Sequence, residues 1–473
     1  MSELLQDQSS RRSMLQGLGG GLGVCGLVSL ITEPCRAADE SRPVASSPTG
    51  APRQATQVHD RPRAKRMIQL FMNGGPFQGD FFDPKPALNE FAGQRPKEVE
   101  FRTENATGGL MPVPFKFERR GECGLPVSEL LPRLGDHIDD LCIIRSMHTD
   151  NPNHGPALFL MNNGTMTPTR PSLGSWLMYG LGSENSDLPG YVVLCPGRPV
   201  RFAELWSSGF LPGEFQGTYL NHSDLDLRKM LPNIRNAQLS PEQQRRQLDL
   251  LRRINSQHLS EHGGESALET RISSMETAFR MQFAASDAFD INREPPAVRA
   301  EYGSSHFANS CLLARRLVER GVRFVQIYYG NGQPWDTHRN HNATTQNLAK
   351  DIDQPTAALL ADLKRRGLLE DTLVVWGGEF GRTSTSESND GRDHNHWGFT
   401  TWLAGGGVRG GMAHGATDDF GFRAVKDKVH IHDLHATILH LLGLEHERLT
   451  FRHAGRDFRL TDVYGEVVSE ILA

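Results

Sequence analysis

The chain has 473 residues and a formal net charge of −5 at pH 7. This slightly acidic balance excludes a general electrostatic attraction to nucleic acid or to an anionic membrane. Hydrophobic residues make up 37% of the chain, and its 48 glycines and 27 prolines favour turns and long loops over a helical bundle. We therefore expect a soluble globular protein that is large enough to bury a substantial core.

The N-terminus has the layout of an export signal. Arg11 and Arg12 precede a glycine-rich, weakly apolar segment at 16–31, and small residues follow at 35–38. The adjacent arginines predict a twin-arginine signal at 1–37, with a plain basic amphipathic start as the alternative. The apolar run is too short for a stable membrane span. We expect the twin-arginine export machinery as a partner, and a periplasmic or extracellular location.

The rest of the chain has the pattern of one large α/β domain. Residues 38–66 are rich in proline, serine, arginine and alanine without apolar periodicity, which predicts a disordered linker before a domain at 67–473. Helical patterns at 304–320 and 354–366 each precede a predicted strand, as in an α/β fold. Amphipathic helices predict a helical insertion at about 198–296. Short apolar runs typical of buried strands lie at 67–72, 141–145, 191–194, 322–329, 373–376 and 400–403.

Polar side chains follow several of these predicted strands, at the edge where open α/β sheets bind ligands. Glu379 and Arg382 follow the strand at 373–376, and a polar loop leads from them to Asp393 and His394. Carboxylate and imidazole are the ligands that Zn²⁺ and Mn²⁺ use when thiolate is absent. The alternative is a surface loop with some histidines and an arginine–glutamate ion pair. Other polar residues near predicted strand ends are Asn73, Asp80, His148, His154, Asp336, His338, Arg392 and His396.

Several motifs resemble those of one family. They include Asn73-Gly74-Gly75-Pro76, Trp335-Asp336-Thr337-His338, Gly378-Glu379-Phe380-Gly381-Arg382-Thr383, Arg392-Asp393-His394 and Asp433-Leu434-His435-Ala436-Thr437. They resemble the domain-of-unknown-function 1501 family of twin-arginine-exported bacterial proteins, which is similar to the alkaline phosphatase and sulfatase superfamily. The resemblance implies an alkaline-phosphatase-like mixed sheet flanked by helices. It also implies hydrolysis of phosphate or sulfate esters at one or two divalent metals (Zn, Mn, Mg or Ca).

The resemblance and the positions of residues at predicted strand ends together assign roles to individual residues. Asp336 and His338 would hold one metal, and Arg382 or Arg392 would clamp the substrate anion. His154 lies before a predicted helix, where it suits an anion or metal site, or equally a capping role. The expected metal ligands are Asp336, His338, Glu379, Asp393, His394 and His396; the expected catalytic residues are Arg382, Arg392 and His154; the expected substrate-binding residues are Asn73, Asp80 and His148.

The sequence departs from the superfamily pattern at three positions. Phe380 stands where a metal-binding histidine is common, and Phe77 stands where relatives often carry serine. Met166 occupies the nucleophile position of a partial sulfatase signature, so formylglycine chemistry is not expected. Water activated at a metal could replace the missing nucleophile. We therefore expect an exported metal-dependent hydrolase that acts on small-molecule or polysaccharide esters. The alternatives are a catalytically silent protein that binds an anionic glycan or a partner protein, and a purely structural protein.

Overall fold

The computed structural model describes residues 58–97, 100–197, 202–231, 238–262 and 266–473. The predicted signal at 1–37 and most of the predicted linker at 38–66 lie outside the described residues. Within the described residues, no helix combines the length and the apolar character that crossing a membrane requires.

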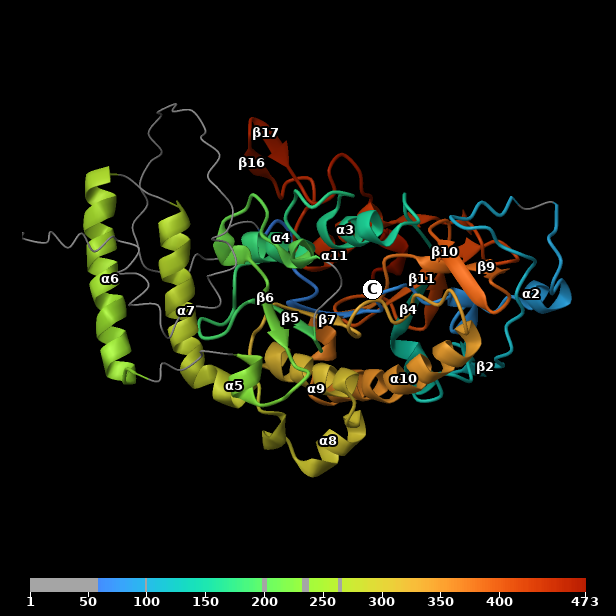
Figure 1. The fold of residues 1–473 in the computed structure, drawn as a ribbon, viewed down its shortest axis with the longest axis horizontal. Helices are drawn as coiled ribbons and strands as arrows, with labels where there is room; N and C mark the ends of the chain where they lie inside the picture. Colours follow the sequence, from blue (N-terminus) through green and yellow to red (C-terminus); the bar gives the residue numbers. More distant parts are fainter. Residues whose placement is uncertain (1–57, 98–99, 198–201, 232–237, 263–265) are drawn as a thin grey trace, which may run out of the picture.

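A nine-stranded mixed sheet forms the centre of the molecule (Figure 1). The strand order is β12-β4-β11-β8-β1-β7-β5-β6, with β15 also paired to β4. Only β11 runs antiparallel to its neighbours. The mixed sheet expected from the sequence is thereby confirmed. The strands are β1 (Arg66–Phe71), β4 (Leu141–His148), β5 (Tyr191–Cys195), β6 (Thr218–Asn221), β7 (Phe324–Tyr328), β8 (Thr372–Gly377), β11 (Phe399–Ala404), β12 (Met412–His414) and β15 (Val429–His430).

Helices cover both faces of this sheet, so its central strands are apolar on both sides. Successive side chains of a strand point to opposite faces. Ile68 and Leu70 of β1 accordingly belong to one apolar cluster, together with residues of α9 (His306–Glu319) and α10 (His341–Arg365). Met67 and Phe71 belong to a second cluster on the other face. The helices of that second cluster are α3 (His154–Asn163), α4 (Leu173–Leu181) and α11 (Ile431–Leu441).

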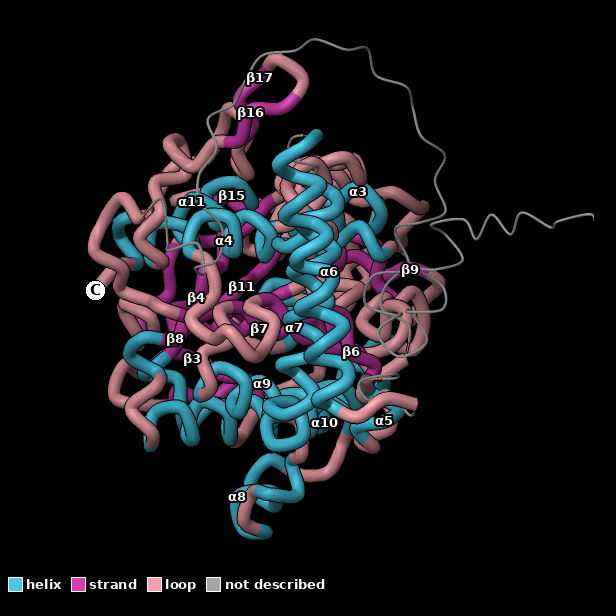
Figure 2. The backbone as a smooth tube through the Cα atoms, turned by 90° about the vertical axis from the view of Figure 1, so that its left-hand side faces the viewer, coloured by secondary structure: helices cyan, strands magenta, loops and turns pink. Residues whose placement is uncertain are grey.

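The predicted insertion at about 198–296 contains helices and also one strand of the main sheet. Its long helices α6 (Pro241–His262) and α7 (Ser266–Ala288) lie side by side at one end of the molecule (Figures 1 and 2). The short helix α5 (Leu227–Met230) follows β6, which extends the sheet edge through parallel pairing with β5. The sequence analysis did not identify β6, because four residues give too short a pattern to recognise.

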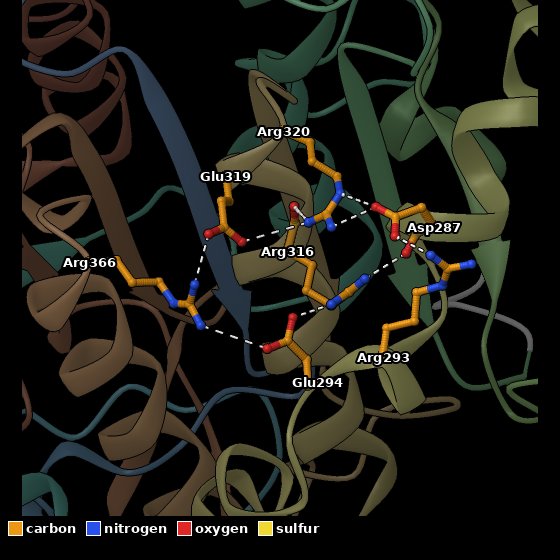
Figure 3. Close-up of a pocket in the computed structure, with 7 residues that line it drawn as sticks. All are labelled: Asp287, Arg293, Glu294, Arg316, Glu319, Arg320 and Arg366. Atoms are coloured by element: carbon orange, nitrogen blue, oxygen red, sulfur yellow. Dashed lines mark hydrogen bonds and ion pairs between the residues drawn. The ribbon is translucent and has the colours of Figure 1, made fainter.

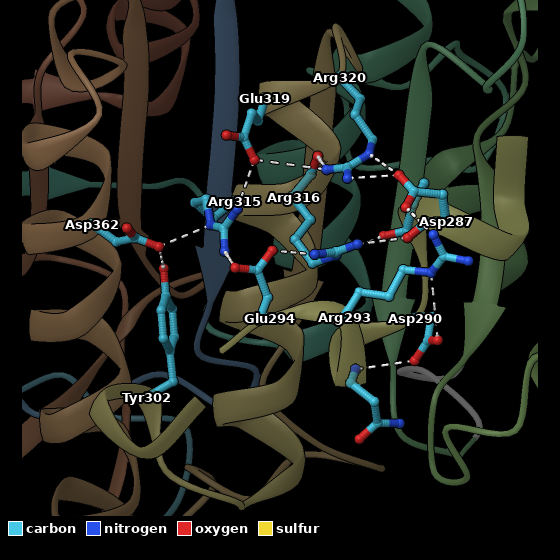
Figure 4. A network of polar contacts seen from close by, with 12 residues as sticks. Asp287, Asp290, Arg293, Glu294, Tyr302, Arg315, Arg316, Glu319, Arg320 and Asp362 are labelled. Carbon is cyan, nitrogen blue, oxygen red and sulfur yellow. Dashed lines mark hydrogen bonds and ion pairs between the residues drawn. The ribbon is translucent and has the colours of Figure 1, made fainter. Parts of the chain in front are cut away.

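Buried ion pairs attach the end of this insertion to the core helices. Arg315, which is fully buried, contacts Asp362 of α10 at 2.9 Å and Glu294 at 2.8 Å (Figure 4). Tyr302, the last residue of α8 (Pro296–Tyr302), donates its hydroxyl to Asp362. A concavity beside this network is lined by charged side chains that already pair with one another (Figure 3). They are Asp287, Arg293, Glu294, Arg316, Glu319, Arg320 and Arg366.

The remaining elements are short. The segment after β8 was expected to be a polar loop, but it forms the hairpin β9 (Gly381–Glu387) and β10 (Gly391–Asn395). The turn has positive φ at Ser388 and Asn389, and Gly391 follows it. The other short elements are α2 (Pro86–Glu90), β2 (Phe117–Arg120), β3 (Leu125–Ser128), β13 (Ala416–Thr417), β14 (Ala424–Lys426), β16 (Phe451–His453) and β17 (Arg456–Phe458).

Candidate metal centre

Three histidines converge on one carboxylate oxygen at the carboxyl edge of the sheet. The Asp336 Oδ1 atom lies 3.2 Å from His154 Nε2, 2.9 Å from His338 Nε2 and 3.2 Å from His394 Nε2. The Nε2 atoms of His338 and His394 are 3.1 Å apart. We call these four residues the histidine–aspartate cluster. Asp336 and His338 follow β7, His394 lies on β10, and His154 is the first residue of α3.

The other ring nitrogen of each histidine pairs with a glutamate. An imidazole that donates Nδ1–H to a carboxylate keeps a lone pair on Nε2, and this pairing fixes both the tautomer and the ring orientation. Three Nε2 atoms and a carboxylate oxygen therefore converge on one small volume, and such a set of donor atoms suits a metal ion. The pairs are His154 with Glu379 at 2.7 Å, His338 with Glu387 at 2.5 Å and His394 with Glu104 at 2.6 Å.

Contacts between the histidines and carboxylates shift the pKa values of the cluster residues. Contact with Asp336 raises the pKa of His338 to about 9, against the opposing effect of burial. Burial lowers the pKa of His154, but hydrogen bonds to Asp336 and Glu379 outweigh it and the net shift is upward. Burial would raise the pKa of Asp336, but the three histidines and Arg382 hold it far below its usual range. Without a metal, protons on the imidazoles balance the carboxylates.

Access to the cluster is one-sided. The side chains of His338 and Asp336 are 32% and 22% exposed, whereas that of His154 is 6% exposed. The ring of Phe380 packs against His154 and His394, with centroids 4.7 and 4.9 Å away. Within the described part of the chain, the solvent-exposed side of the cluster is therefore that of Asp336 and His338.

Arg382 supports the cluster from beneath. Its fully buried guanidinium forms an ion pair with Asp336 Oδ1 at 2.7 Å and donates hydrogen bonds to the Gly75 carbonyl at 3.0 Å and to the Gly74 carbonyl. A side chain at Gly74 would place Cβ 2.4 Å from the Asp336 nitrogen, and the φ of Gly74 is +110°. Only glycine fits this close approach of two chain segments. Arg382 was expected to clamp a substrate anion, but its donors are used to hold Asp336 and this turn.

Arg392 was the other expected anion clamp, and it lies apart from the cluster. It is fully buried, donates to the Thr383 and Met111 carbonyls at 2.9 and 3.1 Å, and lies 4.0 Å from the Phe77 ring centroid. Burial lowers its pKa to about 10. Because β10 turns this side chain inward, its guanidinium does not face solvent or the cluster.

Two of the expected metal ligands, Glu379 and His396, take other positions, whereas Asp393 lies beside the cluster. Glu379 is fully buried and accepts from Gly74 N–H at 3.0 Å as well as pairing with His154, so it lies behind the histidines. Asp393 has one carboxylate oxygen within 4.8 Å of ligand atoms of His338 and His394, so it remains a candidate ligand, and both of its oxygens also accept hydrogen bonds from Asn105. His396 follows the end of β10 and packs on Trp397, and burial lowers its pKa to about 4.

The expected substrate-binding residues also lie outside the cluster. Asn73 is buried and donates to the Gly330 carbonyl at 3.1 Å, which joins the ends of β1 and β7. Asp80 is buried and pairs with His341 at 2.8 Å, and His341 in turn contacts the Thr337 hydroxyl. The ring of His148 packs against that of His430, on a different strand end. Asn73 and Asp80 therefore connect chain segments next to the cluster.

Sequence reasoning did not identify the glutamates that support the histidines. Glu387 faces Gly391 across the β9–β10 hairpin, and the Asn389-Asp390-Gly391 turn signal could have revealed that hairpin. Glu104 lies 290 positions from His394 along the chain, and no local pattern connects the two.

The chain belongs to the family described as "Protein of unknown function (DUF1501)", whose model matches residues 64–472. A comparison with curated proteins found no match. Similar solved structures include Ps i-CgsB, with 9% identity, coverage of 80% of this chain and 72% of that chain, and a TM-score of 0.36. The PsFucS1 sulfatase from Pseudoalteromonas sp. has 11% identity, coverage of 81% and 69%, and a TM-score of 0.33. TAB5 alkaline phosphatase with Mg bound has 11% identity, coverage of 81% and 99%, and a TM-score of 0.34. At these values the activity has to be argued from the site itself.

Proposed function

We propose that this protein is an exported metal-dependent hydrolase of phosphate or sulfate esters. The observation that carries the proposal is the convergence of three imidazole nitrogens on the Asp336 carboxylate, each imidazole held by its own glutamate. The ester class rests on the motifs that resemble the phosphatase and sulfatase superfamily. The adjacent Arg11 and Arg12 support export through the twin-arginine route.

The donor set favours zinc over calcium or magnesium. Three imidazoles and one carboxylate suit Zn²⁺, and also Mn²⁺ or Fe²⁺, whereas Ca²⁺ and Mg²⁺ prefer oxygen ligands. His154, His338, His394 and Asp336 would hold the ion. When bound, such an ion polarises an ester oxygen and lowers the pKa of water.

The surrounding residues would orient this site and exclude water from its inner side. The three glutamates fix the histidine rings, and Arg382 fixes Asp336. Phe380 closes the inner side, so an ester would approach past His338. The His338 and Asp336 side chains are partly exposed, as a catalytic rather than purely structural metal site requires.

Metal analysis of the purified protein tests the proposal. We expect stoichiometric zinc by elemental mass spectrometry, lost in Asp336→Ala and in His394→Ala. His440→Ala is a matched control, because His440 lies at the end of α11 outside the cluster. Zinc-loaded protein should then hydrolyse aryl phosphate or aryl sulfate esters. Absence of metal after reloading would refute the site.

A catalytically silent binding protein is the second candidate, and one observation favours it. In the described part of the chain, no serine, threonine or cysteine side chain hydrogen-bonds to the cluster, and both expected clamp arginines are buried. Stoichiometric zinc without turnover of either ester class would favour this function. In that case the zinc-loaded protein should bind a sulfated or phosphorylated oligosaccharide, and the Asp336→Ala variant should not.

A further inference from the structure

A loop distant in sequence supplies one of the glutamates of the cluster. Residues 101–108, here called the Glu104 loop, begin at Phe101 and end where Gly108 donates its N–H to the Ser386 carbonyl of β9 at 2.7 Å. Phe101 is buried against Phe422, with ring centroids 5.1 Å apart. The two ends of the loop are therefore anchored to the β9–β10 side of the molecule.

Arg95 closes the loop at its base. Its guanidinium donates to the Phe101 carbonyl at 3.0 Å, to the Thr107 carbonyl at 2.7 Å and to the Gly108 carbonyl at 2.8 Å. One side chain thus ties both ends of the loop together. The planar guanidinium can satisfy several acceptors at fixed angles, which a lysine ammonium cannot do in the same geometry.

The tip of the loop contacts two residues of β10. Glu104 accepts from His394 Nδ1 at 2.6 Å, and its other oxygen lies 3.4 Å from Asn153 Nδ2. Asn105 donates its backbone N–H and its side-chain amide to the two oxygens of Asp393, at 2.6 and 3.0 Å. The Glu104 side chain is 32% exposed, so its position depends on these contacts and not on burial.

We propose that Glu104 is a positioning residue of the metal site, and that docking of the Glu104 loop is thermodynamically coupled to metal binding. The inference rests on the proposed metal centre. Glu104 keeps His394 in the tautomer whose Nε2 lone pair faces the cluster, and it has this effect only when the loop is docked. By reciprocity, a metal that holds His394 in this orientation also stabilises the docked loop.

Zinc affinity of matched variants tests the positioning role. Glu104→Gln keeps the shape but can present an N–H to Nδ1, so we expect zinc affinity to fall by about 10–100-fold. Arg95→Ala does not touch the cluster, and it should lower zinc affinity in the same direction. Glu90→Gln, an exposed change at the end of α2, is the control and should bind zinc as the wild type does. The melting temperature of the metal-free variants identifies any general loss of stability.

Proteolysis tests whether zinc binding stabilises the docked Glu104 loop. Arg102 is exposed within the loop and offers a trypsin site. Zinc should slow cleavage after Arg102 in the wild type and in Glu90→Gln, and should have much less effect in Glu104→Gln. A purely structural role of Glu104 would change the metal-free melting temperature without changing this zinc-dependent protection.

The outcomes separate this inference from the proposed function. If the wild type binds zinc and the Glu104→Gln and Arg95→Ala variants bind it with the same affinity, the inference is overturned and the proposed metal centre remains. Zinc binding with the expected variant effects, but without ester hydrolysis, would support the inference and refute only the activity. Wild-type protein that binds no zinc would overturn both.

Discussion

Replacement of Glu379 by glutamine tests whether a residue that orients a metal ligand, without being one itself, affects zinc affinity. Glu379 is fully buried, accepts from His154 Nδ1 at 2.7 Å and faces the Gly74 N–H at 3.0 and 3.2 Å. Glutamine has the same shape but one acceptor and one donor. If its amide oxygen faces His154, its NH₂ group meets the Gly74 donor. If its NH₂ group faces His154, the imidazole must accept at Nδ1 and carry its proton on Nε2, where the metal would bind.

Both orientations cost free energy, and the size of the cost can be estimated. Loss of a group that orients a metal ligand lowers metal affinity by about 10–100-fold, which corresponds to about 1.4–2.8 kcal/mol. A buried donor without an acceptor costs about 1–3 kcal/mol of folding stability. We therefore expect Glu379→Gln to fold, to melt at a lower temperature than the wild type, and to bind zinc about 10–100-fold more weakly.

Competition with a zinc chelator measures the affinity, and thermal unfolding of the metal-free protein measures the stability. Glu370→Gln is the matched control, because Glu370 is exposed and lies just before β8. An unchanged zinc affinity in a Glu379→Gln variant with lowered stability would mean that the glutamine oxygen still faces His154 and keeps its tautomer. An unchanged zinc affinity in a His154→Ala variant as well would refute the argument for a three-histidine site.

Three further predictions concern the surroundings of the site and the core. Gly74→Ala should destabilise the protein and abolish zinc binding, because the new Cβ would lie 2.4 Å from a backbone nitrogen at a φ of +110°; normal zinc content would contradict this. Asp362→Asn removes one of the carboxylates that pair with the fully buried Arg315 and leaves Glu294 in place, so urea unfolding should show a loss of about 1–3 kcal/mol without a change in zinc affinity. The raised pKa of His338, about 9, predicts that the metal-free protein keeps this histidine's contribution to stability below about pH 6.5 and loses it as the pH rises through about 9. Melting temperatures measured against pH in the presence of a chelator should show this alkaline loss in the wild type and a smaller loss in His338→Gln. An equal dependence of melting temperature on pH in both proteins would refute the assignment of the loss to His338.

The sequence by itself determined the strands of the core and part of the cluster. Apolar β-branched runs identified β1, β4, β5, β7, β8 and β11, because buried strands carry their signal in consecutive residues. Asp336, His338 and His394 could be placed at one edge of the sheet, since parallel strands bring their carboxyl ends together. The family motifs were likewise local and readable, and the match to residues 64–472 confirms the family.

The tertiary structure decided which polar residues meet and what each one holds. Glu379 and Arg382 follow β8 at the same edge of the sheet, yet both side chains turn inward and support the cluster. His396 is only two positions from His394, but β10 ends between them and its ring packs elsewhere. Glu104, which contacts His394, lies 290 positions from it along the chain. Contacts of this kind depend on how loops close over a sheet, and a one-dimensional pattern does not encode that geometry.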